Sequence, residues 1–280
     1  MSAPAELARG GLRKMRTALE APVSYRFTLD DEARVDLNPL LGQSLALRYL
    51  GEIHCVHCGR VSSKSFNQGY CYPCFRRLAQ CDSCIVSPEK CHYHLGTCRE
   101  PEWGDTHCMI EHIVYLANTS GVKVGITRHS QVPTRWMDQG ATQALPVLRV
   151  QTRYQSGLVE TLLKAHVTDR TQWQAMLKGP SEPVDLPAWR DRLLGECADG
   201  IDMLQREHGL QAVQPITDGE VVSIDYPVLE YPTKVKSFNL ERQPLVEGTL
   251  LGIKGQYLIF DTGVINLRKY GGYQVALSQL

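Results

Sequence analysis

Nine of the ten cysteines of this chain lie between residues 55 and 108, and six of them form three Cys-x-x-Cys pairs. Such a pair places two thiolates on one side of a tight turn, at the separation that a tetrahedral Zn²⁺ requires. Cys55, Cys58, Cys71 and Cys74 have the spacing of two zinc knuckles, which is typical of a closed structural site. A redox-active Cys-x-x-Cys usually stands alone beside a βαβ pattern, so three pairs in succession favour metal binding.

A second zinc site is expected downstream, with Cys81 and Cys84 as one knuckle. The spacing from Cys84 to Cys91 equals that from Cys91 to Cys98, which favours Cys91 and Cys98 as the remaining ligands. A close alternative is Cys108 in place of Cys91 or Cys98. Cys81 and Cys84 could also complete a site that begins upstream. The side chains that could supply the missing ligands are Cys91, His92, His94, Cys98, Cys108 and His112. Because no ligand position is left to water, we expect structural zinc, one or two ions per chain.

Composition sets the broad class of the protein. The chain has 280 residues, with 30 Lys and Arg against 30 Asp and Glu, and this length suits two domains or one domain with insertions. A formal net charge of zero excludes a uniformly polybasic nucleic-acid binder but permits local basic patches. The sequence has neither a long apolar run nor the apolar core of a signal peptide. We therefore expect a cytoplasmic protein that does not contact membranes and keeps its thiols reduced.

The pattern of strands and glycines predicts an α+β protein built on a small β-barrel. Residues 23–29 and 44–50 are predicted strands, and short apolar runs separated by glycines follow from residue 220 onward. The early strands are expected to complete the barrel, with a zinc-ribbon-like segment and an α/β segment inserted into it. The predicted parts are N-terminal strands (1–53), a zinc-binding segment (54–110), an α/β segment with following helices (111–210) and a C-terminal β-barrel (211–280).

Local patterns place further elements. The basic stretch of residues 6–20 could form a helix or a frayed leader, although two adjacent glycines weaken a helix there. Strands are predicted over 113–117, 122–126 and 145–154, with helices over 134–139 and 157–167. Asp185 is a candidate helix cap, and an apolar stripe predicts one helix from there to Gly209. Cys197 lies on this stripe and is expected to be a small core residue.

Residues 112–168 resemble the GIY-YIG nuclease domain, in which a three-stranded sheet carries two tyrosine-containing motifs. Tyr115 takes the place of the first tyrosine, and Lys123 stands where the second is expected. By the same resemblance, Arg128 matches a basic residue after the second motif, Arg135 is the helix arginine that contacts phosphate, and Glu160 binds one divalent cation, Mg²⁺ or Mn²⁺.

The resemblance implies phosphodiester chemistry, in which arginines and a Glu-bound cation would neutralise charge in the transition state. Tyr115 could orient or deprotonate the attacking water. Lys123 could replace the missing tyrosine as a base only if burial or neighbouring cations lowered its pKa. Simpler alternatives are a plain strand residue at Tyr115 and a helix-surface pair between Glu160 and Lys164. Because the second tyrosine is replaced, a domain that binds without cleaving is favoured over a nuclease.

The chain as a whole resembles an uncharacterised bacterial domain-of-unknown-function family of zinc-binding proteins. The resemblance rests on residues 64–71, 96–101, 114–118, 133–136 and 252–258. It implies a shared architecture and brings no activity.

Basic residues with interleaved aromatics around the first cysteine quartet suggest a nucleic-acid partner. They are Arg60, Lys64, Arg76 and Arg77 with Phe66, Tyr70, Tyr72 and Phe75. The predicted barrel offers a comparable set: Lys234, Lys236, Lys254, Arg268 and Lys269 with Tyr257 and Tyr270. Together with the α/β segment, the two sets favour a zinc-binding module for DNA or RNA. The alternatives are a metal-dependent phosphodiesterase using Tyr115, Lys123, Arg128, Arg135 and Glu160, and a zinc-stabilised scaffold for protein partners.

Overall fold

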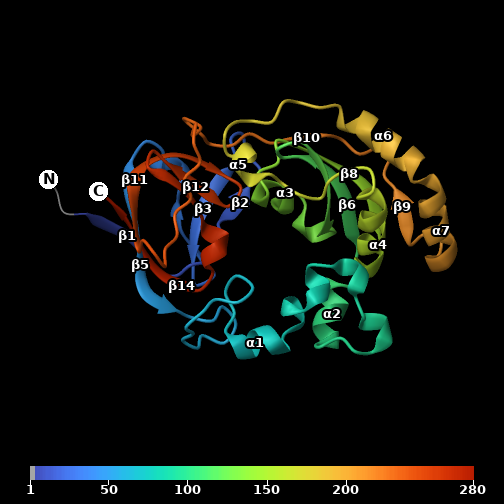
Figure 1. The fold of residues 1–280 in the computed structure, drawn as a ribbon, viewed down its shortest axis with the longest axis horizontal. Coiled ribbons are helices and arrows are strands. Elements are labelled where there is room, and N and C mark those ends of the chain that lie inside the picture. The colour runs from blue at the N-terminus through green and yellow to red at the C-terminus, as the bar shows by residue number, and fades with distance from the viewer. Residues whose placement is uncertain (1–3) are drawn as a thin grey trace.

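The structure, a computed structural model, describes residues 4–280. A strand-rich lobe and an α/β lobe lie side by side, and a cysteine-rich segment connects them along one side (Figure 1). The chain begins in the strand-rich lobe, passes through the cysteine-rich segment and the α/β lobe, and returns to end in the strand-rich lobe. The cysteine-rich segment is therefore held between two folded bodies.

Strands from both ends of the chain form the main sheet of the strand-rich lobe. Its order is β1-β14-β5-β11-β12-β13, and every neighbouring pair is antiparallel. The strands are β1 (Ala5–Gly11), β5 (Ser44–Ile53), β11 (Leu245–Lys254), β12 (Tyr257–Phe260), β13 (Gly263–Asn266) and β14 (Tyr273–Gln279). The strand expected over residues 44–50 is confirmed as β5, and it joins the C-terminal strands in one sheet.

A smaller antiparallel sheet shares the hydrophobic core of this lobe. It consists of β2 (Arg16–Ala18), β3 (Ser24–Leu29) and β4 (Glu32–Asp36), of which β3 was expected. Tyr25 and Phe27 of β3 are fully buried in one cluster with Leu47 and Val275 of the main sheet. The helix or leader considered for residues 6–20 is wrong, because β1 and β2 pair there with β14 and β3.

The β-barrel expected over residues 211–280 is also wrong. Among residues 4–280 no sheet closes on itself, and the main sheet ends at β1 on one side and β13 on the other. Residues 236–238 run along the outer edge of β13, where the Phe238 N–H donates to the Val264 carbonyl at 2.9 Å. This segment forms hydrogen bonds with the edge strand β13, and the three-stranded sheet covers the apolar face of the main sheet. In a barrel, closure of the sheet would have met both needs.

The α/β lobe contains a second antiparallel sheet of order β10-β8-β6-β7, with β9 also paired to β8. Its strands are β6 (His112–Asn118), β7 (Val122–Arg128), β8 (Gln143–Val150), β9 (Val213–Pro215) and β10 (Val222–Ser223). The three strands predicted between residues 113 and 154 are confirmed as β6, β7 and β8. The short β9 and β10 come from residues expected in the barrel, and they extend this sheet instead.

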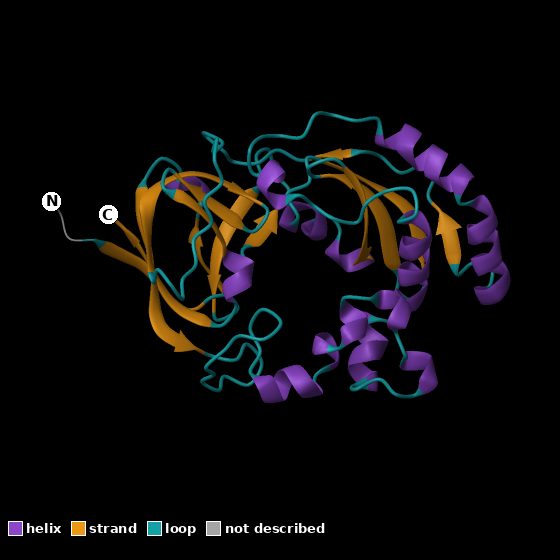
Figure 2. Ribbon diagram, viewed as in Figure 1, coloured by secondary structure: helices purple, strands orange, loops and turns teal. Residues whose placement is uncertain are grey.

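Helices flank this sheet (Figure 2). They are α3 (Thr134–Asp138), α4 (Arg153–Leu163), α6 (Leu186–Glu196) and α7 (Ala198–His208), whereas α5 (Trp173–Met176) packs against β12 and β13 of the strand-rich lobe. The Asp185 cap is confirmed, since its carboxylate accepts from the Ala188 N–H at 3.0 Å. The single helix expected from Asp185 to Gly209 divides at Cys197, whose backbone (φ −103°, ψ 9°) leaves the helical region. The Cys197 side chain is buried, as expected.

The cysteine-rich segment consists of loops and very short helices (Figure 2). It contains α1 (Tyr72–Arg77), α2 (Pro101–His107) and the 3-10 turns η2 (Ala79–Cys81), η3 (Ser83–Ile85), η4 (Pro88–Lys90) and η5 (Tyr93–Leu95). Three further turns lie in the lobes, η1 (Asn38–Leu40), η6 (His129–Gln131) and η7 (Leu267–Tyr270). Within the described residues, no helix has the length and apolar character needed to cross a membrane.

Candidate functional site: a cysteine quartet and a basic central cavity

Cys55, Cys58, Cys71 and Cys74 converge as the sequence predicts. Their sulfur atoms all lie within 4.8 Å of one another, and the Cys58 and Cys71 sulfurs are 3.8 Å apart. Four Zn–S bonds of ~2.3 Å in a tetrahedron place neighbouring sulfurs about 3.8 Å apart. The quartet therefore has the dimensions of a zinc-ribbon-like site and could hold a structural zinc ion.

Two tight turns present these thiols. In the first, the Gly59 N–H donates to the Cys55 carbonyl at 2.9 Å, and Gly59 adopts a left-handed φ of 71° that suits glycine. In the second, Cys71 immediately precedes α1, and Cys74 lies in the first turn of that helix. Each Cys-x-x-Cys pair thus sits on a turn fixed by its own backbone hydrogen bonds.

The remaining predicted zinc ligands separate into two places. Cys81 packs with Cys55, Cys71, Cys74 and Leu78 in the apolar cluster around the first quartet. The other three, Cys84, Cys91 and Cys98, line a small internal cavity together with Cys108. Asp82, Cys84 and His92 also come within 4.8 Å of one another through their ligand atoms.

A much larger cavity of about 970 Å³ lies where the three parts of the molecule meet. The strand-rich lobe contributes Arg13, Arg16 and Arg268, the cysteine-rich segment contributes Tyr70 among others, and the α/β lobe contributes the stretch 123–128. Its walls thus come from segments that are far apart in the sequence.

The cavity is strongly basic. Eight Lys and Arg side chains line it, against four Asp and Glu side chains. Two of the cations are neutralised, because Arg13 pairs with Asp31 at 3.0 Å and Lys14 pairs with Asp138 at 2.6 Å. The other six make no ion pair within residues 4–280: Arg16, Lys123, Arg128, Arg135, Arg153 and Arg268. An excess of unpaired cations around one cavity favours an anionic ligand.

Lys123 reaches this cavity from β7 and is buried. Burial and, to a lesser extent, the positive charge of Arg135 lower the pKa of its ammonium to about 8. A lysine with such a pKa changes charge near physiological pH. Lys123 could act as a base only if its pKa were lowered, and its surroundings in the structure lower it.

Glu160 projects from α4 into the same cavity, but it is already bonded. Its carboxylate lies 3.4 Å from the Lys164 ammonium, which in turn lies 3.0 Å from Asp169. Burial raises the pKa of Glu160. Within residues 4–280, no group of three metal-ligating side chains includes Glu160. The helix-surface pair is therefore present, and the arrangement gives no support to Mg²⁺ or Mn²⁺ at this residue.

Tyr115 lies behind the cavity wall. It is fully buried in β6 and does not line the cavity, whereas Gly125 on the paired strand does. A Cβ atom on Gly125 would lie 2.7 Å from the Tyr115 hydroxyl, so the glycine lets the ring pack directly beneath the cavity surface. The hydroxyl donates to Gln139 Oε1 at 3.2 Å. The structure thus brings four of the five predicted catalytic residues to the cavity and holds Tyr115 beneath them.

Sequence reasoning did not identify several cavity residues. Arg13 and Arg16 lie in the stretch interpreted as a helix or leader, and Arg153 lies in a predicted strand; Arg268, by contrast, belongs to the basic and aromatic set noted on the predicted barrel. Tyr70 of the basic and aromatic patch lines the cavity, whereas Arg60, Lys64, Arg76 and Arg77 do not. The short basic run from Arg13 to Arg16 was the one available signal.

These features define a class: an α+β protein with a zinc-ribbon-like cysteine cluster and a basic cavity between its parts. The family described as "protein of unknown function (DUF2797)" matches residues 42–275, and the chain therefore belongs to this family. Comparisons with curated proteins and with solved structures returned no match. The predicted membership of a domain-of-unknown-function family is confirmed. The GIY-YIG resemblance and a bacterial origin are not supported by these comparisons and stay predictions.

Proposed function

We propose that this protein binds single-stranded DNA or RNA in its central cavity, through the phosphate groups, on a zinc-stabilised framework. The observation that carries the proposal is the ring of six basic side chains without carboxylate partners around one cavity. Five of the six are arginines, whose planar fork matches the geometry of phosphate oxygens. The reduced thiols that a zinc site requires are consistent with a cytoplasmic protein.

The size of the cavity favours a single strand over a duplex. A volume of about 970 Å³ is at the upper end of small-molecule pockets, which span roughly 300–1,000 Å³. A few nucleotides of flexible strand fit such a space, whereas a duplex needs an open surface along its axis. Tyr70 offers one aromatic ring at the cavity wall, so phosphate contacts outweigh base stacking here.

The test is fluorescence anisotropy with short DNA and RNA single strands and with a duplex of the same sequence, over a range of salt concentrations. Arg135→Ala and Arg268→Ala are expected to weaken binding and to lower the salt slope by about one per lost phosphate contact. Arg34→Ala is the matched control, since Arg34 pairs with Glu32 on exposed β4 outside the cavity. Equal effects of all three variants, or no salt-dependent binding, would contradict the proposal and favour the protein-scaffold alternative.

A second candidate is a metal-dependent phosphodiesterase, and one observation favours it. Lys123, Arg135 and Glu160 line the same cavity, and the Tyr115 ring packs against Gly125 in its wall. Lys123 in its neutral form could accept a proton from water, and Arg135 could stabilise the charge on phosphate. Mg²⁺ is often bound by one protein carboxylate together with substrate phosphates. To bind the ion, Glu160 would have to give up its ion pair with Lys164. If the protein cleaves DNA or RNA in the presence of Mg²⁺ or Mn²⁺ and Glu160→Gln abolishes cleavage, it is a phosphodiesterase. If it binds the strand without cleaving it, it is a binding module.

A further inference from the structure

The four remaining clustered cysteines surround a second cavity of ionic size. Cys84, Cys91, Cys98 and Cys108 all line one small pocket of about 10 Å³, but the four sulfurs do not yet form a group within 4.8 Å, so they must draw together around an ion. A space of this volume holds about one water-sized sphere. Three of the four cysteines are buried. We propose that these four thiolates bind a second structural zinc ion, with Cys108 in the position that the sequence spacing assigned to Cys81.

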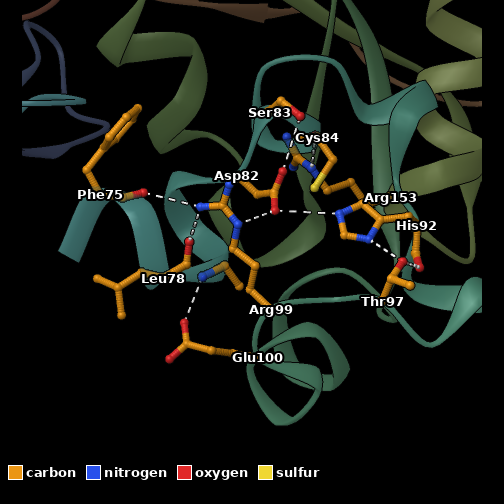
Figure 3. Close-up of polar contacts among 11 residues, drawn as sticks. Phe75, Leu78, Asp82, Ser83, Cys84, His92, Thr97, Arg99, Glu100 and Arg153 are labelled. Atoms are coloured by element: carbon orange, nitrogen blue, oxygen red, sulfur yellow. Dashed lines mark hydrogen bonds and ion pairs between the residues drawn. The ribbon is translucent and has the colours of Figure 1, made fainter. Parts of the chain in front are cut away.

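The surrounding charges account for the choice of ligands. Asp82 and His92 approach Cys84, but they also face each other, with His92 Nε2 at 3.5 Å from Asp82 Oδ2 (Figure 3). The Asp82 carboxylate accepts from Arg99 Nε at 2.6 Å, and His92 Nδ1 is 2.8 Å from the Thr97 hydroxyl. Cys81 lies with the first quartet, and His112 bonds the Ile110 carbonyl through Nδ1 at 2.7 Å and does not line the small cavity. Four free thiols are left for the ion.

A basic side chain offsets the charge of the site. Zinc bound by four thiolates carries two net negative charges, which need nearby cations or hydrogen-bond donors when buried. Arg153 begins α4 and donates to the carbonyl oxygens of Cys84 at 3.4 Å and Ile85 at 2.5 Å (Figure 3). It is thus anchored to the loop that carries the first ligand.

The segment also has no apolar core of its own. The apolar clusters of the molecule include no residue between 82 and 110, while Val86 and Leu95 are exposed. Its regular structure is limited to three 3-10 turns and the short α2. A loop-rich segment without a core is the kind of structure that a bound metal stabilises. The second ion would therefore fold this part of the chain.

Zinc content per chain tests the proposal directly. The intact protein is expected to contain two zinc ions, and Cys91→Ser and Cys108→Ser are each expected to contain one. Cys81→Ala and Cys197→Ala are the controls, since both side chains are buried outside the proposed site. A third variant, Asp82→Asn, tests whether the Asp82 carboxylate binds the ion. These three variants are expected to keep two ions. A single ion in the intact protein, two ions in Cys108→Ser, or one in Cys81→Ala or Asp82→Asn would overturn the proposal.

X-ray absorption on the unsubstituted protein keeps the test valid if a serine variant fails to fold. Two four-thiolate sites give a shell of sulfur alone at ~2.3 Å from zinc. A site that uses Asp82 or His92 instead would add oxygen or nitrogen at ~2.0–2.2 Å. An all-sulfur shell with two ions per chain supports the proposal, and a mixed shell contradicts it.

Discussion

Arg99 donates from Nε to the Asp82 carboxylate at 2.6 Å, and this ion pair joins the two cysteine groups. The same guanidinium donates through Nη1 to the carbonyl oxygens of Phe75 at 3.2 Å and Leu78 at 3.3 Å, at the end of α1 (Figure 3). Asp82 lies two residues before Cys84, and α1 carries Cys74 of the first quartet. The pair therefore fixes the first quartet relative to the second group of cysteines.

Arg99→Ala is expected to destabilise the protein by about 1.5–3 kcal/mol, because the nearly buried Asp82 carboxylate loses a charged partner. Chemical denaturation with zinc present measures the free energy of unfolding. Arg34→Ala removes an ion pair in which both side chains are largely exposed, and it is expected to cost at most about 1 kcal/mol. If the two losses are similar, the Asp82 pair is not a specific link.

Gly157 allows α4 to approach the cysteine-rich segment. A Cβ atom at this position would lie 2.2 Å from the Glu89 backbone nitrogen of η4. Gly157→Ala is therefore expected to destabilise the protein by about 1–3 kcal/mol through overpacking. Gly195 on α6 has open space around its Cβ position, so Gly195→Ala is expected to stabilise by at most about 1 kcal/mol. Thermal unfolding of both variants measures the difference, and a neutral Gly157→Ala would contradict the close contact.

Local patterns predicted what depends on neighbours in the sequence. The first cysteine quartet, the strands β6, β7 and β8 and the Asp185 cap follow from short-range spacing, and the structure contains all of them. The cavity depends on long-range assembly: Arg13 and Arg268 meet Arg135 only because strands from both chain ends share one sheet. The prediction of a barrel was wrong for the same reason, because the spacing of strands in the sequence does not specify whether a sheet closes or packs against another sheet.

If the cavity binds phosphate as proposed, Lys123 is expected to make that binding depend on pH. Its folded-state pKa is about 8, so the cavity is expected to lose one positive charge as pH rises through 8. Binding of a short single strand should therefore weaken between pH 7 and pH 9. Lys123→Arg keeps its charge over this range and is expected to remove that dependence. Anisotropy titrations at constant ionic strength compare the two proteins, and identical pH profiles would exclude a contribution from Lys123.

Lys123 also affects stability, with a sign that follows from the same pKa. The unfolded state holds the lysine proton up to about pH 10.4, whereas the folded state releases it near pH 8. Between these values the unfolded state binds more protons, so this residue makes the free energy of unfolding rise with pH. Denaturation of the protein and of Lys123→Met at several pH values measures this contribution. If the free energy of unfolding of the unsubstituted protein fell with rising pH relative to that of Lys123→Met, the lowered pKa of Lys123 would be contradicted.

His112 is expected to make the fold sensitive to acid. Its side chain is fully buried in β6, and burial lowers the pKa of its imidazole to about 4. The unfolded state takes up the proton near pH 6.5, so stability is present above that pH and is lost as pH falls toward 4. The full difference amounts to about 3 kcal/mol. His112→Gln should flatten the curve of unfolding free energy against pH in this range, and an unchanged curve would contradict the burial of a neutral imidazole.

Removal of zinc is expected to unfold the cysteine-rich segment before the two lobes. The two large apolar clusters contain no residue between 54 and 110, so the lobes keep their own cores when the metal leaves. Limited proteolysis with a zinc chelator should first cut within residues 54–110, and added zinc should restore protection. The basic cavity would lose one wall, so single-strand binding should weaken in the same samples. Protection of the segment without zinc, or simultaneous loss of both lobes, would show that the metal does not hold this part of the fold by itself.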